Sequence, residues 1–357
     1  MRQRGAGGAK RATQASQTGR EGQARHTAHW LGSRPSRDEK GRAARLERIA
    51  QYTGLPMPTD PVQRPPTIDA PAAARWARLP AHPASPWLHE EIGRRMEDRL
   101  QWITAKPQRW ADWSPLRGGL EAHALVARRY RDAVPYVIEP DAALAARTAE
   151  ALNTPWWSAR RWQGVRARVE APPEAGVDLL WANMALHMAA DPQALIAEWH
   201  RHLATDGFLM FSCLGPDTLR ELRALYEGLG WPPACHQFTD MHDWGDMLVG
   251  AGFAEPIMDM ERIVLTWATP EAAFAELRGL GRNLHPARFA GLRGRGWQAE
   301  LAGALAGSAA QAPDGRISMT FEIIYGHAFK PPPRVALSGE SAVSLRQMRE
   351  MLQRGRP

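Results

Sequence analysis

The chain has 357 residues, of which 44% are hydrophobic, and a formal net charge of +7. This composition suits a globular protein with a sizeable core. Its two cysteines, Cys213 and Cys235, exclude a disulfide framework or a cysteine zinc site and indicate a reducing, cytoplasmic location. The longest apolar run, residues 179–190, is interrupted by Asn183 and His187. It falls short of the ~20 residues that span a bilayer, so we expect no membrane partner.

The positive charge lies in residues 1–70, which hold 13 Lys and Arg against 6 Asp and Glu, whereas the rest holds 32 of each sign. This segment is poor in large apolar residues, so we predict a disordered basic tail. An organelle transit peptide and a nucleic-acid-binding arm are alternatives, but the segment lacks an apolar helical face and has no aromatic residue before Trp30. We expect no nucleic-acid partner, a folded domain over 71–332 and a C-terminal tail over 333–357.

The first predicted element of the folded part is a helix over residues 85–103. Ser85 is expected to be its N-cap and Pro86 its first residue. Apolar residues recur in it every four positions and predict a buried stripe formed by Leu88, Ile92, Met96 and Leu100.

Short apolar runs then alternate with helical patterns. The runs are "RWADWS", "VPYVIEP", "VRARVE", "VDLLWAN" and "GFLMFSC", and the helical patterns include "LEAHALVARRY", "DAALAARTAEAL" and "PQALIAEWHRHL". This alternation predicts an α/β fold with a parallel sheet. Further along, "MHDWGDMLVGAGF" predicts a helix closed by glycine, and residues 255–267 and 316–329 predict long strands. Two helices are expected between those strands, in an insertion over about 268–316.

In an open parallel sheet, ligands bind outside the carboxyl ends of the strands. That edge is expected to collect Asp112–Gly119, Glu139 and Asn183–His187, which follow three different strands. Glu139 comes about twenty positions after a turn that contains glycine, which is where a carboxylate accepts hydrogen bonds from a ribose diol. The alternative is a solvated loop residue or a cap of the following helix.

Four stretches carry a family resemblance, namely "VDLLWANMALHMAADPQALIAEWHRHLATDGFLMFS", "GPDTLRELR", "FTDMHDWGDMLVGAGFAEPIMDMERIVLTW" and "FEIIYGHAFKP". With them the chain resembles class I S-adenosylmethionine-dependent methyltransferases, and most closely the malonyl-carrier-protein O-methyltransferases of biotin synthesis. The resemblance implies a Rossmann-like seven-stranded sheet, mostly parallel with one antiparallel strand and with helices on both faces. It implies S-adenosyl-L-methionine as the cofactor, bound by Asp112, Gly118, Gly119, Glu139 and Asn183.

Two features depart from the family's pattern. The family has Gly-x-Gly-x-Gly after the first strand, whereas "ADWSPLRGG" places Ser114 and Leu116 where the first two glycines belong. The family also has an acidic residue after the third strand, where this chain has Arg168, with Glu170 two residues on. These changes narrow, reshape or abolish the expected cofactor pocket.

Methylation of a carboxylate needs no general base, because the acceptor is already ionised near neutral pH. No catalytic residue can therefore be named by its type. The insertion is expected to overhang the site, and its arginines suit an anionic substrate or an acidic carrier protein, or else form an ordinary solvated face. These arginines are Arg278, Arg282, Arg288, Arg293 and Arg295. We select Arg282, His187 and Tyr325 as candidate substrate-binding residues. The alternatives are a structural role for the His187 ring and a place in the core for Tyr325.

For two other groups of residues we predict a structural role. The carboxylates near His236 and His242 are expected to be helix caps, so no metal is predicted. Trp156 and Trp157 are expected in the core, with the wall of an adenine pocket as the alternative.

The sequence thus predicts a methyltransferase that acts on a malonyl group carried by an acyl-carrier protein in biotin synthesis. One alternative is a relative that modifies a protein side chain, as mitochondrial complex I assembly factors do. Another is a scaffold or assembly factor that keeps the fold but has lost the cofactor. The oligomeric state is not predicted.

Overall fold

The computed structural model describes residues 68–80, 85–152, 165–307, 312 and 314–333. All of them belong to one compact unit of the chain, Arg64–Pro357. The expected N-terminal tail up to residue 67, the C-terminal tail from residue 334, and Trp156 and Trp157 lie outside the described residues.

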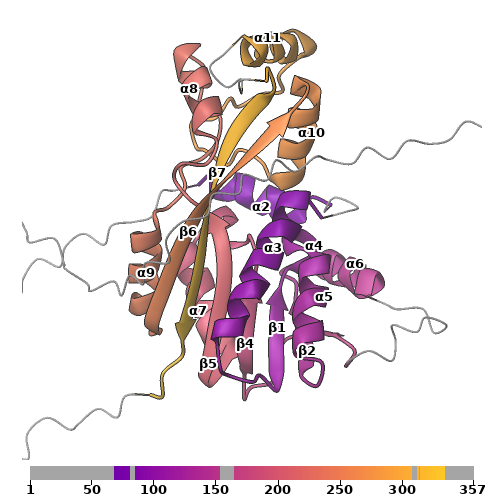
Figure 1. The fold of residues 1–357 in the computed structure, drawn as a ribbon, viewed down its shortest axis with the longest axis vertical. Coiled ribbons are helices and arrows are strands. Elements are labelled where there is room, and N and C mark those ends of the chain that lie inside the picture. Colours follow the sequence, from indigo (N-terminus) through magenta and orange to yellow (C-terminus); the bar gives the residue numbers. More distant parts are fainter. Residues whose placement is uncertain (1–67, 81–84, 153–164, 308–311, 313, 334–357) are drawn as a thin grey trace, which may run out of the picture. The chain divides into compact units, whose positions relative to one another are not determined.

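A seven-stranded sheet with the order β3-β2-β1-β4-β5-β7-β6 forms the centre of this unit (Figure 1). The strands are β1 Arg109–Trp113, β2 Val134–Ile138, β3 Arg168–Val169, β4 Val177–Ala182, β5 Leu203–Leu214, β6 Ala254–Trp267 and β7 Ile317–Phe329. Strands β1 to β5 pair in parallel, and β7 is antiparallel to both β5 and β6. Strand β6 therefore runs in the same direction as β5. The predicted fold class, a mostly parallel sheet with one antiparallel strand, is confirmed.

Helices connect the strands and flank the sheet. They are α2 Ala70–Arg78, α3 Trp87–Arg99, α4 Pro115–Gly118, α5 Leu120–Arg129, α6 Ala142–Leu152, α7 Pro192–His202, α8 Arg220–Gly228, α9 Met241–Gly250, α10 Pro270–Leu280 and α11 Arg295–Ala306. Short 3₁₀ segments lie at Leu100–Trp102 and Leu186–Met188. Among the described residues, none of the helices combines the length and the apolar character that a membrane crossing requires.

Alternation along the strands divides the core into two layers. Trp110, Leu179 and Phe208 belong to one cluster with residues of α3 and α5. Their chain neighbours Ala111 and Leu180 belong to the other, with residues of α7 and α9. Successive strand residues point to opposite faces, so both faces of the sheet are covered. In Figure 1, α3 and α5 lie in front of the strands and α7 lies behind them.

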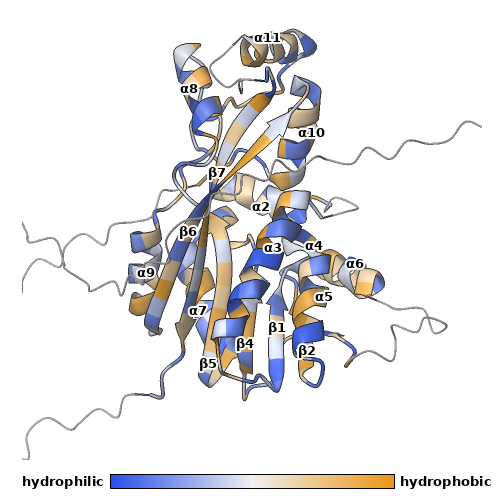
Figure 2. Cartoon of the chain, in the orientation of Figure 1, coloured by the Kyte–Doolittle hydropathy of each residue, from blue (hydrophilic) through white to orange (hydrophobic). Residues whose placement is uncertain are grey.

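The helix α3 buries the predicted stripe, since Leu88, Ile92, Met96 and Leu100 are at most 1% exposed. Its outward side is charged, and Figure 2 colours it mostly blue. The expected N-cap is wrong, because the helix begins after Pro86 with no side-chain cap. The hydroxyl of Ser85 instead accepts a hydrogen bond from the backbone N–H of Leu120 at 3.3 Å.

The helices α10 and α11 lie between β6 and β7 in the chain. The last residue of β6, Trp267, is the register partner of the first residue of β7, Ile317. Because β6 runs parallel to β5, the segment between these two residues leaves the sheet at its carboxyl edge. Figure 1 shows α8, α10 and α11 together at that end of the sheet.

Candidate functional site

The turn after β1 stands where the family has its glycine-rich loop. Ser114 has φ +56°, a left-handed conformation that is uncommon for residues other than glycine. Pro115 follows as the first residue of the four-residue helix α4. The backbone N–H of Ser114 donates to the carbonyl of Ile138 at 2.9 Å, which ties this turn to the end of β2.

Glu139, immediately after β2, is hydrogen-bonded to that same turn. Its carboxylate accepts from the hydroxyls of Ser114 and Thr148, both at 2.8 Å, and from the backbone N–H of Leu116 at 3.3 Å. Burial raises the pKa of Glu139, while these three donors favour the charged form and oppose the rise. The carboxylate is thus at the predicted edge, but its bonds are to the protein.

Asp112, near the end of β1, is directed toward α5. It is 2% exposed, and its Oδ2 lies 2.8 Å from Nδ1 of His123. Burial raises the pKa of Asp112, and the bond to His123 opposes this.

Asn183, just after β4, fixes the glycine pair. Its Nδ2 donates to the carbonyl of His89 at 2.8 Å and to the carbonyl of Gly118, and its Oδ1 accepts from the hydroxyl of Ser212 at 2.6 Å. A Cβ on Gly118 would lie 2.8 Å from the backbone oxygen of Asn183. Gly119 has φ +132°, a backbone conformation that favours glycine. Close packing therefore requires glycine at position 118, and the backbone conformation requires it at position 119.

Arg117 joins the turn to the end of α2. Its Nη2 donates to the carbonyls of Trp76 at 3.0 Å, Ala77 at 3.2 Å and Leu79 at 2.6 Å. The guanidinium carbon also lies 4.3 Å from the centre of the Trp76 ring. Carbonyls in the last turn of a helix have no partner within the helix, so one cation satisfies several of them.

Contacts within the protein occupy the predicted cofactor edge. The polar side chains of the predicted cofactor set, Asp112, Glu139 and Asn183, are all bonded within the protein. Leu116 is 8% exposed and packs with Leu144 beside this edge. Neither of two cavities described here is lined by the predicted cofactor residues.

The second departure from the family's pattern is Arg168, which lies in β3. Arg168 lies over Tyr136, with 5.7 Å between the guanidinium carbon and the ring centre. Arg168 and Glu170 line a cavity of about 480 Å³ together with residues at the end of α6. We assign no ligand to this cavity.

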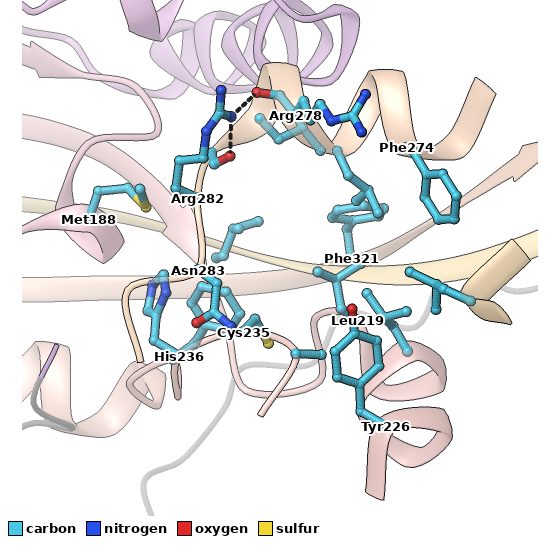
Figure 3. A pocket seen from close by; sticks show the side chains of 18 of the residues that line it. Met188, Leu219, Tyr226, Cys235, His236, Phe274, Arg278, Arg282, Asn283 and Phe321 are labelled. Carbon is cyan, nitrogen blue, oxygen red and sulfur yellow. Dashed lines mark hydrogen bonds between the residues drawn. The ribbon is translucent and has the colours of Figure 1, made fainter. Parts of the chain in front are cut away.

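A second cavity, of about 330 Å³, lies between the carboxyl edge of the sheet and the insertion (Figure 3). This volume is in the usual range for small-molecule sites. Its wall is mainly apolar and includes Leu214, Leu219, Leu222, Phe274, Leu301 and Phe321. Residues from β5, α8, α10, α11 and β7 thus form one pocket.

Three arginines line the same cavity, in three different situations. Arg282 donates to the carbonyls of Arg278 at 2.5 Å and Gly281 at 2.7 Å, as the dashed lines in Figure 3 show. Arg293 lies within 6 Å of four aromatic ring centres, those of Tyr226, Trp231, Phe289 and Trp297. The guanidinium of Arg278 has no hydrogen bond or ion pair with another described residue.

Two neutral histidines lie at the inner wall. Burial lowers the pKa of His187 well below 6.5 and that of His236 to about 4. The Nε2 of His236 donates to the carbonyl of His187 at 3.0 Å. Nδ1 of His187 is buried and has no hydrogen-bond partner among the described residues.

The predicted substrate residues are not all at this cavity. His187 and Arg282 line it, but Tyr325 does not. Tyr325 is 1% exposed, its hydroxyl donates to Glu261 at 2.6 Å, and Arg99 lies 3.8 Å from its ring centre. Its side chain therefore contributes to the contact between α3 and the strands β6 and β7.

The acidic and histidine side chains near residue 240 form a helix cap. Asp240 is the N-cap of α9 and accepts from the backbone N–H of His242 at 2.8 Å. Within the described ranges, no three metal-binding side chains come together.

Several contacts of the site could not be predicted from the sequence. The bonds from Ser114 to Glu139 and from Arg117 to α2 involve separations of 25 and 38 or more positions. The departure from the glycine pattern was the available signal, since Ser114 and Arg117 both belong to that segment. Nothing in the spacing of Phe289 and Trp297 marked the aromatic surroundings of Arg293.

Comparison with known proteins gives a consistent family. The family described as "Methyltransferase domain" matches residues 118–211. The malonyl-[acyl-carrier protein] O-methyltransferase of Gallionella capsiferriformans is 38% identical over 268 residues, which cover 73% of this chain and 90% of that protein. The enzyme of the same name from Laribacter hongkongensis is 39% identical over 257 residues, covering 69% of this chain and 84% of that protein.

A solved structure, that of the YcgJ protein from Bacillus subtilis, is 13% identical with a TM-score of 0.45 and covers 69% of this chain and 100% of its own. The two relatives match this chain across most of their own length. The chain belongs to the malonyl-[acyl-carrier protein] O-methyltransferase family.

Proposed function

We propose that the protein is a methyltransferase that uses S-adenosyl-L-methionine to methylate the free carboxyl of a malonyl group on an acyl-carrier protein, as a step of biotin synthesis. The observation that carries this proposal is the 38% identity to a malonyl-[acyl-carrier protein] O-methyltransferase over 90% of that protein. We infer a cytoplasmic location, because Cys213 and Cys235 are both unpaired and buried.

The cavity beneath the insertion supports an acceptor site. Its apolar wall suits the apolar parts of an acyl group and of the arm that links this group to the carrier protein. Burial of an unpaired carboxylate against that wall would cost free energy. The carboxylate therefore belongs at the arginine side, where Arg278 is exposed and offers a planar pair of donors. Arg282 is the weaker choice, because its guanidinium already donates to two carbonyls.

The chain needs no general base for this reaction, because a malonyl carboxyl is ionised near neutral pH. What it must do is hold the acceptor in one orientation and exclude water. The neutral rings of His187 and His236 fit that task, since they add no charge to the inner wall. Nδ1 of His187 is available to bond a polar atom of the acceptor, such as a thioester oxygen.

Direct assay tests the proposal. Incubation with malonyl-[acyl-carrier protein] and S-adenosyl-L-methionine should add one methyl group to the carrier-bound acyl group, as mass spectrometry of the intact carrier detects. Arg278→Gln should raise KM for the malonyl carrier roughly tenfold, the effect of losing one charge-assisted contact. Arg295→Gln, also exposed and in the insertion but not lining the cavity, is the matched control. Cofactor binding without methyl transfer to this carrier would reject the proposed acceptor.

One observation favours a second function, a scaffold or assembly factor that works without a cofactor. The polar groups of the predicted cofactor set are bonded to the protein itself, as Glu139 is to Ser114, Leu116 and Thr148. Calorimetric titration with S-adenosylhomocysteine distinguishes the two. Saturable binding that Glu139→Ala weakens supports the enzyme, and no heat at millimolar ligand supports the scaffold.

A further inference from the structure

We propose that the cofactor site of this chain is gated: the nucleoside of S-adenosyl-L-methionine binds only after the turn 114–118 leaves Glu139, and Arg117 keeps that turn closed by holding the end of α2. This inference rests on the proposed function, because it takes the cofactor from it. It goes further by naming the contacts that oppose binding.

The closed turn and a ribose compete for the same carboxylate. A ribose diol donates to an acidic residue after the second strand of such sheets. In this chain both oxygens of that residue, Glu139, already accept, one from the Ser114 hydroxyl and the other from the Leu116 N–H and the Thr148 hydroxyl. Two of these three donors belong to the turn. The diol can take the place of the Ser114 hydroxyl if that side chain rotates, but it can take the place of the Leu116 N–H only if the turn moves.

The closed conformation of the turn carries a cost that opening would relieve. Ser114 has φ +56°, which costs a non-glycine residue conformational energy. The contacts that compensate for this cost include the bonds to Glu139 and the burial of Leu116 against Leu144. Both are local to the turn, so both are lost together when it opens.

The side chain of Arg117 links the turn to α2. Its guanidinium donates to three carbonyls, those of Trp76, Ala77 and Leu79, and stacks on the Trp76 ring. The turn cannot swing out without breaking these bonds or carrying α2 with it. The carboxylate of Glu139 attracts the Arg117 guanidinium, whereas the like charges of Arg147 and Arg282 repel it.

The other end of α2 is attached to the acceptor side. The backbone N–H of Asp69 donates to the carbonyl of Leu284 at 2.8 Å, and its carboxylate pairs with Arg288 at 2.6 Å. Leu284 follows the cavity residues Arg282 and Asn283 and packs on Ala72 and Ala73 of α2. The helix α2 thus connects the cofactor turn to the cover of the acceptor cavity. We therefore expect an acceptor bound in that cavity to change the fraction of molecules in which the turn is open. By the same coupling, cofactor binding at the open turn should change the affinity for the acceptor.

The test measures binding of S-adenosylhomocysteine to the full chain by calorimetry, with no acceptor present. A site that is open in only a fraction of molecules has an apparent Kd raised by that fraction. Arg117→Ala should therefore tighten binding about tenfold relative to the native chain. Ser114→Gly with Leu116→Gly should also tighten it, because the pair removes one donor to Glu139 and the buried leucine. Arg128→Ala, an exposed arginine on α5, is the matched control and should leave Kd unchanged.

Hydrogen exchange supplies a readout that does not depend on binding. In the absence of ligand, Arg117→Ala should speed exchange in peptides covering 70–79 and 114–120, and Arg117→Lys should give an intermediate rate. Equal exchange rates in the native chain and Arg117→Ala overturn the gate, even where a variant folds poorly enough to spoil calorimetry.

The two proposals fail in different ways. Tight binding by the native chain that Arg117→Ala does not improve overturns the gate and leaves the proposed function standing. Absence of binding by the native chain, by Arg117→Ala and by the double glycine variant overturns both.

Discussion

Gly118 shows how a single missing side chain shapes the cofactor edge. A Cβ at this position would lie 2.8 Å from the backbone oxygen of Asn183, which cannot rotate away. Gly118→Ala should therefore lower the free energy of unfolding by about 1–3 kcal/mol, the usual range for overpacking. Gly303→Ala, on α11 with no described heavy atom within 4 Å of its Cβ, should raise it by roughly 0.5–1 kcal/mol. Urea denaturation measures both, and equal effects would contradict the assigned contact.

His236 gives the protein a pH-dependent stability. Burial lowers its pKa from 6.5 to about 4, so the folded chain keeps this ring neutral where the unfolded chain already binds a proton. The contribution of His236 to the free energy of unfolding is therefore fully present above pH 6.5 and is lost as the pH falls toward 4. The loss is at most about 3 kcal/mol for a shift of this size.

His236→Gln removes that titration, so its free energy of unfolding should fall less than that of the native chain between pH 7 and pH 5. Urea denaturation at the two pH values gives the comparison. Parallel pH profiles for the native chain and His236→Gln would show that the ring is accessible to protons.

Glu139 marks the limit of sequence reasoning at this scale. Its position after β2 was predictable, because strand ends and the family's acidic position are both local patterns. Its bonds were not, because Ser114 lies 25 positions earlier and approaches only when β1 and β2 pair. The engagement of Asn183 with His89 across 94 positions was hidden for the same reason.

The helix α10 contributes four residues to the wall of the cavity beneath the insertion, namely Phe274, Leu277, Arg278 and Leu280. Thr269 is its N-cap and accepts from the backbone N–H of Ala272 at 3.3 Å. Thr269→Ala should cost about 1 kcal/mol and speed hydrogen exchange within 270–280. Asp191→Ala removes the corresponding cap of α7, whose residues do not line the cavity, and serves as the control. We expect KM for the acceptor to rise only in the first variant, and an equal rise in both would contradict this role of α10.

Elements with a strong local pattern were predictable, and those fixed by distant partners were not. The alternation in "VDLLWAN" and "GFLMFSC" identified β4 and β5. Strand β3 has only two residues, since its sequence "VRARVE" offers little apolar surface. The cap at Ser85 was predicted wrongly because its hydroxyl bonds Leu120, which is 35 positions away. The helix α2 was not predicted, because only two of its residues, Ala72 and Ala73, are buried.

At the scale of the whole molecule, the net positive charge lies outside the unit that contains the sheet. Residues 1–63 hold 12 Lys and Arg against 5 Asp and Glu, so a chain that begins at Arg64 has no net charge. Arg64 is also where the compact unit containing the sheet begins. Removal of residues 1–63 should lower the salt needed for elution from a cation exchanger and leave the thermal unfolding midpoint unchanged. A lower midpoint would show that the first 63 residues contribute to the stability of the sheet.

The pairing of Trp267 with Ile317 has an evolutionary consequence. The segment between them begins and ends at two paired positions of neighbouring strands. The geometry of the strands therefore does not constrain the length of this segment. Relatives can therefore acquire longer, shorter or differently charged covers while inheriting the same scaffold. Selection for a new acceptor can act on this excursion with little penalty to folding.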